Sequence, residues 1–357
     1  MEELKSSLKR RILEAIGKGK VEQKDGIYRF SEAIGDEIPR GTVVIGNRVV
    51  YGYPKIRRIF SLESGVKRNF DGGKELWVEE KIDGYNLRAV YEGGKLYCIS
   101  RGGFLDYFST EKMAGFPEIS WFFSKCPRMV LHFEMVGNTP YTQPARGFDV
   151  KYYVFDIGDG KNQFLDCGER RRICEKHGLN AVPLLAHMKS PDVKKLKEIA
   201  VSIDKGGGEG MVMRQENPRK VLKFVVPSSD IRDLAQNSAQ IFDMPAGFMK
   251  QRVFRSAVSV AELGLDKAAY GRKLGEAMHS GLHACIRGGG EVAEDFEVMV
   301  KSMETWKKIT SHMPREVEIR VDYTVREKGG FRIGFKKVYK QGSRQVRRAI
   351  EGYSQAD

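Results

Sequence analysis

Long apolar segments are missing from this 357-residue sequence. No run approaches the roughly 18 apolar residues that a membrane-spanning helix requires, so we expect no membrane association. The N-terminal segment carries acidic residues and an amphipathic spacing that includes Ile12 and Ile16, in place of the apolar centre of a signal peptide. These absences predict a cytoplasmic protein.

Cysteine is also scarce, with five residues and no CxxC pair. The pattern excludes a disulfide framework and a cysteine-based zinc site, and it indicates reduced thiols. Glycine is plentiful, but neither glycine-rich segment has the form of a phosphate-binding P-loop. Residues 206–210 lack the GK[ST] ending, and residues 288–290 follow no predicted strand.

Positive charge is in excess, with 61 Lys and Arg against 47 Asp and Glu, a formal net charge of +14. Such a balance suits a polyanionic partner, meaning a nucleic acid or a nucleotide. One basic segment follows the N-terminal region and contains Lys55, Arg57 and Arg58. Contact with phosphates and a solvated strand edge are both compatible with this segment.

Apolar alternation separated by glycine turns predicts an α+β fold. We expect a small α+β domain, a mainly antiparallel domain with a cleft between its sheets, a helical module and a small C-terminal α+β domain. Their predicted ranges are 1–62, 63–228, 229–313 and 314–357. Within the helical module, residues 292–313 are predicted as one helix.

The chemistry centres on residues 78–88, which read VEEKIDGYNLR. Lys81 follows a predicted strand and precedes an Asp-Gly turn, after which a second strand begins. A lysine at the end of a buried strand is partly desolvated, so its pKa can fall. Because only the neutral amine attacks, Lys81 is a candidate nucleophile. A surface lysine beside a hairpin turn has the same local pattern.

Further charged and aromatic residues stand where predicted strands meet glycines or turns. They include two isolated acids, an aromatic residue and several cations: Arg101, Glu134, Phe155, Glu209, Lys220 and Lys223. Lys220 and Lys223 are three residues apart on one predicted strand, so only one of them can point into a cleft. A phosphoryl transfer needs such a set, because it requires a nucleophile, charge neutralisation, metal-binding carboxylates and a stacking surface.

The ordered segments KIDGYN, SRGG, HFEMVG, YVFDI, EGMVMR and VLKFV resemble the nucleotidyltransferase motifs of covalent ligases and mRNA capping enzymes. The whole chain is similar to the archaeal ATP-dependent RNA ligases that act as homodimers. Asn86 separates the branches, because DNA ligases and capping enzymes place arginine there. The resemblance implies a ligase-type nucleotidyltransferase core at 63–228 and dimerisation through 229–313.

The resemblance also implies the reaction. Lys81 would attack the α-phosphate of ATP and form lysyl-AMP, and the AMP would pass to an RNA 5′-phosphate before a 3′-hydroxyl displaces it. Lys223 would neutralise the α-phosphate, and Glu209 and Glu134 would bind Mg²⁺ or Mn²⁺. The other implied nucleotide-binding residues are Glu79 or Glu80, Ile82, Asn86, Arg88, Arg101, Phe155 and Lys220. A second lysine that many ligases carry after the Lys223 position is Val225 here, so the role of Lys220 stays open.

Two alternatives belong beside this prediction. One is a DNA ligase or a GTP-using capping enzyme, against which Asn86 argues. The other is a non-catalytic RNA-binding relative, against which the intact Lys81, Glu134, Glu209 and Lys223 argue. The expected partners are RNA with 5′-phosphate and 3′-hydroxyl ends and a second copy of the chain.

Overall fold

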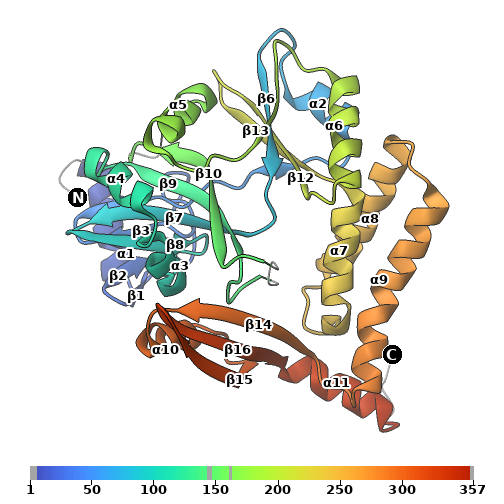
Figure 1. Cartoon of the computed structure of the whole chain (residues 1–357). Helices are drawn as coiled ribbons and strands as arrows, with labels where there is room; N and C mark the ends of the chain where they lie inside the picture. Colours follow the sequence, from blue (N-terminus) through green and yellow to red (C-terminus); the bar gives the residue numbers. More distant parts are fainter. Residues whose placement is uncertain (1–5, 143–146, 161–162, 354–357) are drawn as a thin grey trace.

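The computed structural model describes residues 6–142, 147–160 and 163–353 (Figure 1). The N-terminal part begins with α1 (Ser6–Gly17) and continues into four short strands. These are β1 (Glu22–Lys24), β2 (Ile27–Arg29), β3 (Val43–Ile45) and β4 (Arg48–Val50), which pair in chain order as an antiparallel sheet. Ile12 and Ala15 of α1 pack against Phe30 and Ile38 in a small core.

Two sheets form the central part, and glycine turns connect several of their strands. One is the antiparallel sheet of β7 (Tyr85–Glu92), β8 (Lys95–Ser100), β9 (Val130–Gly137) and β10 (Val150–Gly158), in the order β10-β9-β7-β8. The other contains β5 (Arg57–Arg58), β6 (Leu76–Lys81), β11 (Leu184–Met188), β12 (Gly210–Gln215) and β13 (Lys220–Val225), in the order β11-β6-β12-β13-β5. All of its pairs are antiparallel except β13 with β5.

Helices cover the outer faces of these sheets (Figure 1). They are α2 (Leu62–Asn69), α3 (Tyr107–Met113), α4 (Pro117–Lys125), α5 (Cys167–His177) and α6 (Val193–Lys205). Phe122 and Phe123 of α4 join Leu131 and Phe133 of β9 in the largest core cluster. Ala200 of α6 belongs to a second core, which forms against the other sheet. The predicted antiparallel α+β domain is therefore confirmed.

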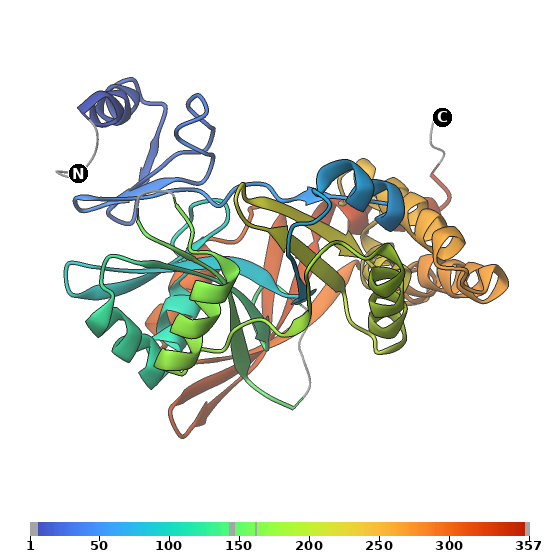
Figure 2. The ribbon, with the colours of Figure 1, turned by 90° about the horizontal axis from the view of Figure 1, so that it is seen from above.

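A group of helices follows β13, and a small sheet follows the helices. The helices are α7 (Pro227–Asn237), the 3₁₀ turn η1 (Ser238–Gln240), α8 (Gly247–Glu262) and α9 (Lys267–Arg287). The sheet consists of β14 (Ala293–Val300), β15 (Val317–Glu327) and β16 (Gly330–Tyr339), in the order β14-β16-β15. α10 (Met303–Ser311) and α11 (Lys340–Ile350) complete the chain. Figure 2 shows the N-terminal part at one end of the molecule and α8 and α9 at the other.

The prediction of one helix over residues 292–313 is wrong. Residues 293–300 form β14, which pairs with β16, and α10 begins only at Met303. The reason is a period of two, because Phe296, Val298 and Val300 are buried in alternation. β14 therefore belongs to the C-terminal sheet, and α10 packs against α3 and β14. In the described ranges, no helix is long and apolar enough to cross a bilayer.

Candidate active site

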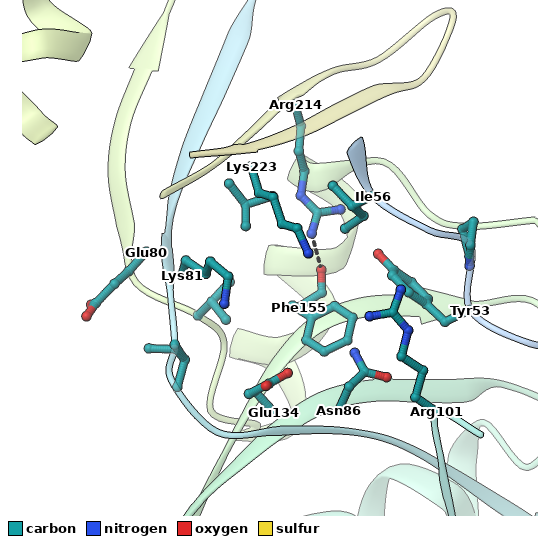
Figure 3. Close-up of a pocket in the computed structure, with 14 residues that line it drawn as sticks. Tyr53, Ile56, Glu80, Lys81, Asn86, Arg101, Glu134, Phe155, Arg214 and Lys223 are labelled. Atoms are coloured by element: carbon teal, nitrogen blue, oxygen red, sulfur yellow. Dashed lines mark hydrogen bonds between the residues drawn. The ribbon is translucent and has the colours of Figure 1, made fainter. Parts of the chain in front are cut away.

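A pocket of about 660 Å³, including its open mouth, lies between the two central sheets. β6, β12 and β13 supply one wall with Lys81, Val212, Arg214 and Lys223. The facing strands β7, β9 and β10 supply the other wall with Asn86, Glu134 and Phe155. The predicted cleft is thus present, and Figure 3 shows these side chains directed toward a common space.

Lys81 is placed by the last residue of β6 and the tight turn that follows. β6 pairs with β12 up to the partners Lys81 and Gly210, and the chain then crosses to β7 in the other sheet. Gly84 permits the crossing, since a Cβ there would lie 2.3 Å from the carbonyl oxygen of Met135. The turn therefore holds Lys81 and Asn86 on opposite walls of one pocket.

Lys81 forms an ion pair with Glu209, the residue immediately before β12. Both side chains are largely buried, with exposed fractions of 18% for Lys81 and 13% for Glu209. Burial raises the pKa of Glu209, and the positive charge of Lys81 opposes that rise. The pair places a carboxylate directly on the amine that is the candidate nucleophile.

Two more titratable groups in the pocket have strongly perturbed pKa values. Burial raises the pKa of Glu134 to about 8, Lys81 opposes the shift, and Glu209 adds to it. The pKa of Lys223 is lowered to about 8, mainly by burial and in addition by the positive charges of Arg58, Lys81 and Arg101. A pocket that concentrates such groups is the usual environment of catalytic acids, bases and anion-binding cations.

Phe155 is fixed by a buried network behind the pocket. Arg214 donates a hydrogen bond of 2.9 Å to the carbonyl of Phe155 and contacts Asp156 at 3.0 Å. Tyr53 donates to the same Asp156, and its ring meets that of Phe155 edge to face at 5.2 Å. The arginines hold the pKa of Asp156 well below its usual range despite burial. The aromatic face of Phe155 is thereby held in one orientation.

The structure brings together most of the residues that the sequence predicts for nucleotide binding. The pocket is lined by Glu80, Lys81, Ile82, Asn86, Arg101, Glu134, Phe155 and Lys223. Glu80 lies at its edge, with a side chain that points away from the other labelled residues (Figure 3). Glu209 joins the set through its ion pair with Lys81.

Three of the residues predicted for nucleotide binding, Glu79, Arg88 and Lys220, do not line this pocket. Glu79 is 1% exposed and contacts Arg170, Arg171 and Arg214. It shares a face of β6 with Lys81, but these buried arginines surround its carboxylate. Its role is to neutralise buried arginines.

Arg88 is fully buried and donates to the carbonyls of Gly41, Val50, Tyr51 and Ser100. It fastens β7 to the N-terminal sheet.

Lys220 forms an ion pair of 2.7 Å with Asp71 and does not line the pocket.

Sequence reasoning missed six lining residues, which are Tyr53, Pro54, Ile56, Val182, Val212 and Arg214. Val212 and Arg214 share the face of β12 that closes the pocket, and a period of two starting from Gly210 could have found them. Tyr53, Pro54 and Ile56 come from the segment that joins the N-terminal part to β5, and only the docking of that part brings them to the site.

Comparison with known families agrees with this geometry. The model of the RNA ligase family matches residues 74–225, which hold every strand of the two central sheets except β5, and most of the pocket. The model of the Pab1020 ligase C-terminal region matches residues 238–353. A protein of Methanocaldococcus jannaschii, MJ0414, of uncharacterised function, is 30% identical over 77% of this chain and 74% of its own length.

The chain belongs to the RNA ligase family. Among solved structures, two similar ones extend the match to nearly the whole chain. An archaeal ATP-dependent RNA ligase (form 2) is 25% identical, with a TM-score of 0.87 over 97% of this chain and 96% of that one. An Aquifex aeolicus protein, provisionally described as an ATP-dependent DNA ligase, is 27% identical, with a TM-score of 0.88 over 98% of this chain and 100% of that one. The predicted family and its fold are confirmed.

Proposed function

We propose that this RNA ligase uses ATP to join RNA 5′-phosphate and 3′-hydroxyl ends through a lysyl-AMP intermediate on Lys81. The observation that carries the proposal is the placement of Lys81 between Glu209 and the pocket that Phe155 and Lys223 line. A base stacked on the edge-anchored Phe155 ring would direct its phosphates toward Lys81 and Lys223. The ATP dependence of the archaeal structural neighbour supports the choice of nucleotide.

In the first step, the Lys81 amine forms a bond to the α-phosphorus and the bond to pyrophosphate breaks. Glu209 forms an ion pair with Lys81 and is placed to accept the proton that the nitrogen gives up as the new bond forms. Lys223 and Arg101 line the same pocket and would neutralise charge that develops on the phosphate oxygens.

In the later steps, a phosphate oxygen of the RNA 5′ end displaces the Lys81 nitrogen from AMP, which gives an RNA-adenylate. The 3′-hydroxyl oxygen then attacks the 5′-phosphorus, the phosphodiester bond forms, and AMP leaves. Lys223 and Arg101 remain beside the AMP phosphate through these steps, because they line the pocket that holds it.

Glu134 and Glu209 fit a magnesium or manganese ion. No group of three or more His, Cys, Asp and Glu side chains forms a metal site in the described ranges. Magnesium in such enzymes is typically held by one or two carboxylates together with substrate phosphates. The negative charge of Glu209 contributes to the raised pKa of Glu134, and a cation bound between the two carboxylates would offset this repulsion. The ion would supply neutralisation of phosphate charge.

We also propose that the active form is a homodimer built through the helices α7 to α9. Exposed large apolar side chains on this module support the proposal, among them Phe242, Phe254 and Ile286. Self-association would cover these side chains, as apolar patches of this kind commonly mark interaction surfaces.

The direct test is strand sealing. A 5′-phosphorylated RNA with a 3′-hydroxyl is incubated with the protein, ATP and MgCl₂, and its 5′-phosphate is then challenged with phosphatase. Phosphatase-resistant circles or concatemers are expected with RNA and ATP. An all-DNA strand of the same sequence serves as the matched substrate, because one structural neighbour is described as a DNA ligase. Sealing of DNA alone would overturn the RNA assignment, and sealing of neither would overturn the activity.

A further inference from the structure

A second hollow lies beside the nucleotide pocket and shares a wall with it. The hollow holds about 940 Å³, including space open to solvent, and Tyr53, Pro54 and Ile56 line both cavities. These three residues belong to the segment that runs from the N-terminal part into β5. Figure 3 shows Tyr53 and Ile56 on the side of the nucleotide pocket opposite Lys81.

The lining of this second hollow is basic. It contains Lys55, Arg57, Arg219 and Lys220 and no carboxylate. Arg219 contacts Asp156 at 2.5 Å and Lys220 contacts Asp71 at 2.7 Å, so their charges are compensated from outside the lining. Lys55 and Arg57 are exposed, and neither forms an ion pair or a side-chain hydrogen bond with another described residue. Two positive charges are therefore available to a ligand.

The short strand β5 connects these charges with the phosphate end of the nucleotide pocket. Arg57 pairs with Leu222 and Arg58 with Lys223 in the parallel register. Arg57 lines the second hollow, whereas Arg58 lowers the pKa of Lys223 and so lies near it. The Nε of Arg58 is buried and has no hydrogen-bond partner among the described residues. The consecutive cations Arg57 and Arg58 thus have different neighbours, because Arg57 lines the second hollow and Arg58 lies near Lys223 of the nucleotide pocket.

We propose that this basic groove, defined by Lys55, Arg57, Arg219 and Lys220, binds the phosphodiester backbone of the RNA strand that is to be sealed. The inference rests on the proposed RNA-sealing activity. A polymer suits the groove better than a small anion does. The free cations of the groove, Lys55 and Arg57, are exposed along a strand edge and do not converge on one point as buried donors. Proteins that bind single-stranded nucleic acids use such cations to contact the backbone. The Phe164 ring also lines the groove, and the guanidinium of Arg219 lies over it at 4.3 Å.

The groove explains why the basic segment before residue 62 is charged on both sides. Alternate residues of this segment lie on different sides. Arg58 lies near Lys223 of the nucleotide pocket, and Lys55 and Arg57 line the second hollow. An RNA backbone seated there would lie one wall away from the pocket in which Lys81 carries AMP. Removal of Lys55 and Arg57 should therefore weaken RNA binding without changing lysyl-AMP formation, since neither residue lines the nucleotide pocket.

The test compares Lys55→Gln/Arg57→Gln with a matched control, Lys18→Gln/Lys20→Gln, which removes two exposed lysines beside α1. Binding of a 5′-phosphorylated single-stranded RNA is measured at several salt concentrations. The groove variant should bind at least tenfold more weakly than wild type at low salt. For the groove variant, the slope of log affinity against log salt concentration should become less negative by about 1.4, at roughly 0.7 for each lost phosphate contact. The control should match wild type.

Lysyl-AMP formation from ATP without RNA is measured in the same proteins. The groove variant should form it within about twofold of wild type, which also shows that its pocket is folded. RNA affinity and salt slope equal to those of wild type would overturn the groove. Failure of wild type to form lysyl-AMP would instead overturn the proposed activity, so the two failures are distinguishable.

Discussion

Lys220 and Lys223 belong to the same strand and have different surroundings. Lys223 lines the nucleotide pocket, and burial there lowers its pKa to about 8. Lys220 is paired with Asp71 outside that pocket. Because residues three apart on a strand project to opposite faces, a single strand supplies one cation to the pocket and one to a surface ion pair.

This difference predicts unequal effects of two alanine substitutions. Lys223→Ala should slow lysyl-AMP formation by about 10²–10³-fold, the usual effect of removing one preorganised group that stabilises transition-state charge. Lys220→Ala should leave the rate within about twofold, because neither Lys220 nor its partner Asp71 lines the pocket. Single-turnover formation of the adduct from ATP measures both. Equal losses in the two variants would contradict the assignment.

At the residue scale, the motifs led to the strand ends that line the pocket, but they did not always identify which side chains enter it. Lys81, Glu134, Phe155 and Lys223 were predictable because nucleotidyl transfer demands their chemistry at strand ends. Glu79 was not, because the acid-acid pair before Lys81 gives no sign of which side chain meets buried arginines. That choice depends on α5 and β12, which are distant in sequence.

At the scale of elements, β7 is tied to the N-terminal sheet by one side chain. Arg88 donates to the carbonyls of Gly41, Val50 and Tyr51 on the N-terminal side, and burial lowers its pKa to about 9. The N-terminal part in turn supplies Tyr53 to the nucleotide pocket. A structural residue thus positions a wall of the site without touching the nucleotide.

Arg88→Met should destabilise the fold by roughly 3 kcal/mol or more, because buried carbonyls would lose their donors. The N-terminal part should loosen, and residues near Tyr53 should become sensitive to protease. Thermal unfolding and limited proteolysis measure these effects. A rise in the KM for ATP with unchanged stability and protease resistance would instead support a phosphate-binding role for Arg88.

β16 carries a buried lysine whose charge is costly. Lys337 packs over the rings of Phe296 and Tyr141, at 4.3 Å and 5.8 Å, and burial lowers its pKa to about 8 although Glu294 opposes the shift. An unfolded lysine titrates near 10.4. Between about pH 8 and 10.4 the unfolded chain binds more protons than the folded one, so stability rises with pH in that window.

Lys337→Met should therefore be more stable than wild type at pH 7, by up to about 3 kcal/mol less the roughly 1 kcal/mol of its cation–π contacts. The gap should shrink as pH rises from 8 toward 10.5, because the wild-type lysine becomes neutral in both states. Unfolding is followed by fluorescence across this pH range. A gap that stays constant with pH would contradict the buried-charge account.

The C-terminal sheet of β14, β15 and β16 shows how far sequence periodicity identifies strands. The strands β15 and β16 were predictable from their alternation and the glycine turn between them. β14 was assigned to a helix because its acids, Glu294, Asp295 and Glu297, interrupt the apolar pattern. Pairing with β16 determines its conformation, and that contact joins residues about 40 positions apart.

At the scale of the whole molecule, the sealing site depends on parts from three regions of the chain. The central sheets supply Lys81 and Glu209, and the N-terminal part supplies Tyr53. The helices after β13 lie close to Arg58 of β5, since Asp230 and Arg255 influence the pKa of Arg58. Any change in how these parts dock is expected to change the reaction.

The helical module predicts the assembly state. Because Phe242, Phe254 and Ile286 expose large apolar surfaces on it, the mass in solution should be about 81 kDa, twice that of the 40.4 kDa chain. Light scattering after gel filtration measures it at micromolar concentration. A Phe242→Ser/Phe254→Ser variant should shift toward the monomer mass. A wild-type monomer under these conditions would contradict the dimer.

The proposed reaction depends on covalent adenylation of Lys81. Intact-protein mass spectrometry after incubation with ATP and MgCl₂ tests this step in wild type, Lys81→Ala and Lys220→Ala. We expect a gain of one AMP in wild type and in Lys220→Ala, and none in Lys81→Ala. An AMP adduct that persists in Lys81→Ala, or no adduct in folded wild type, would contradict it.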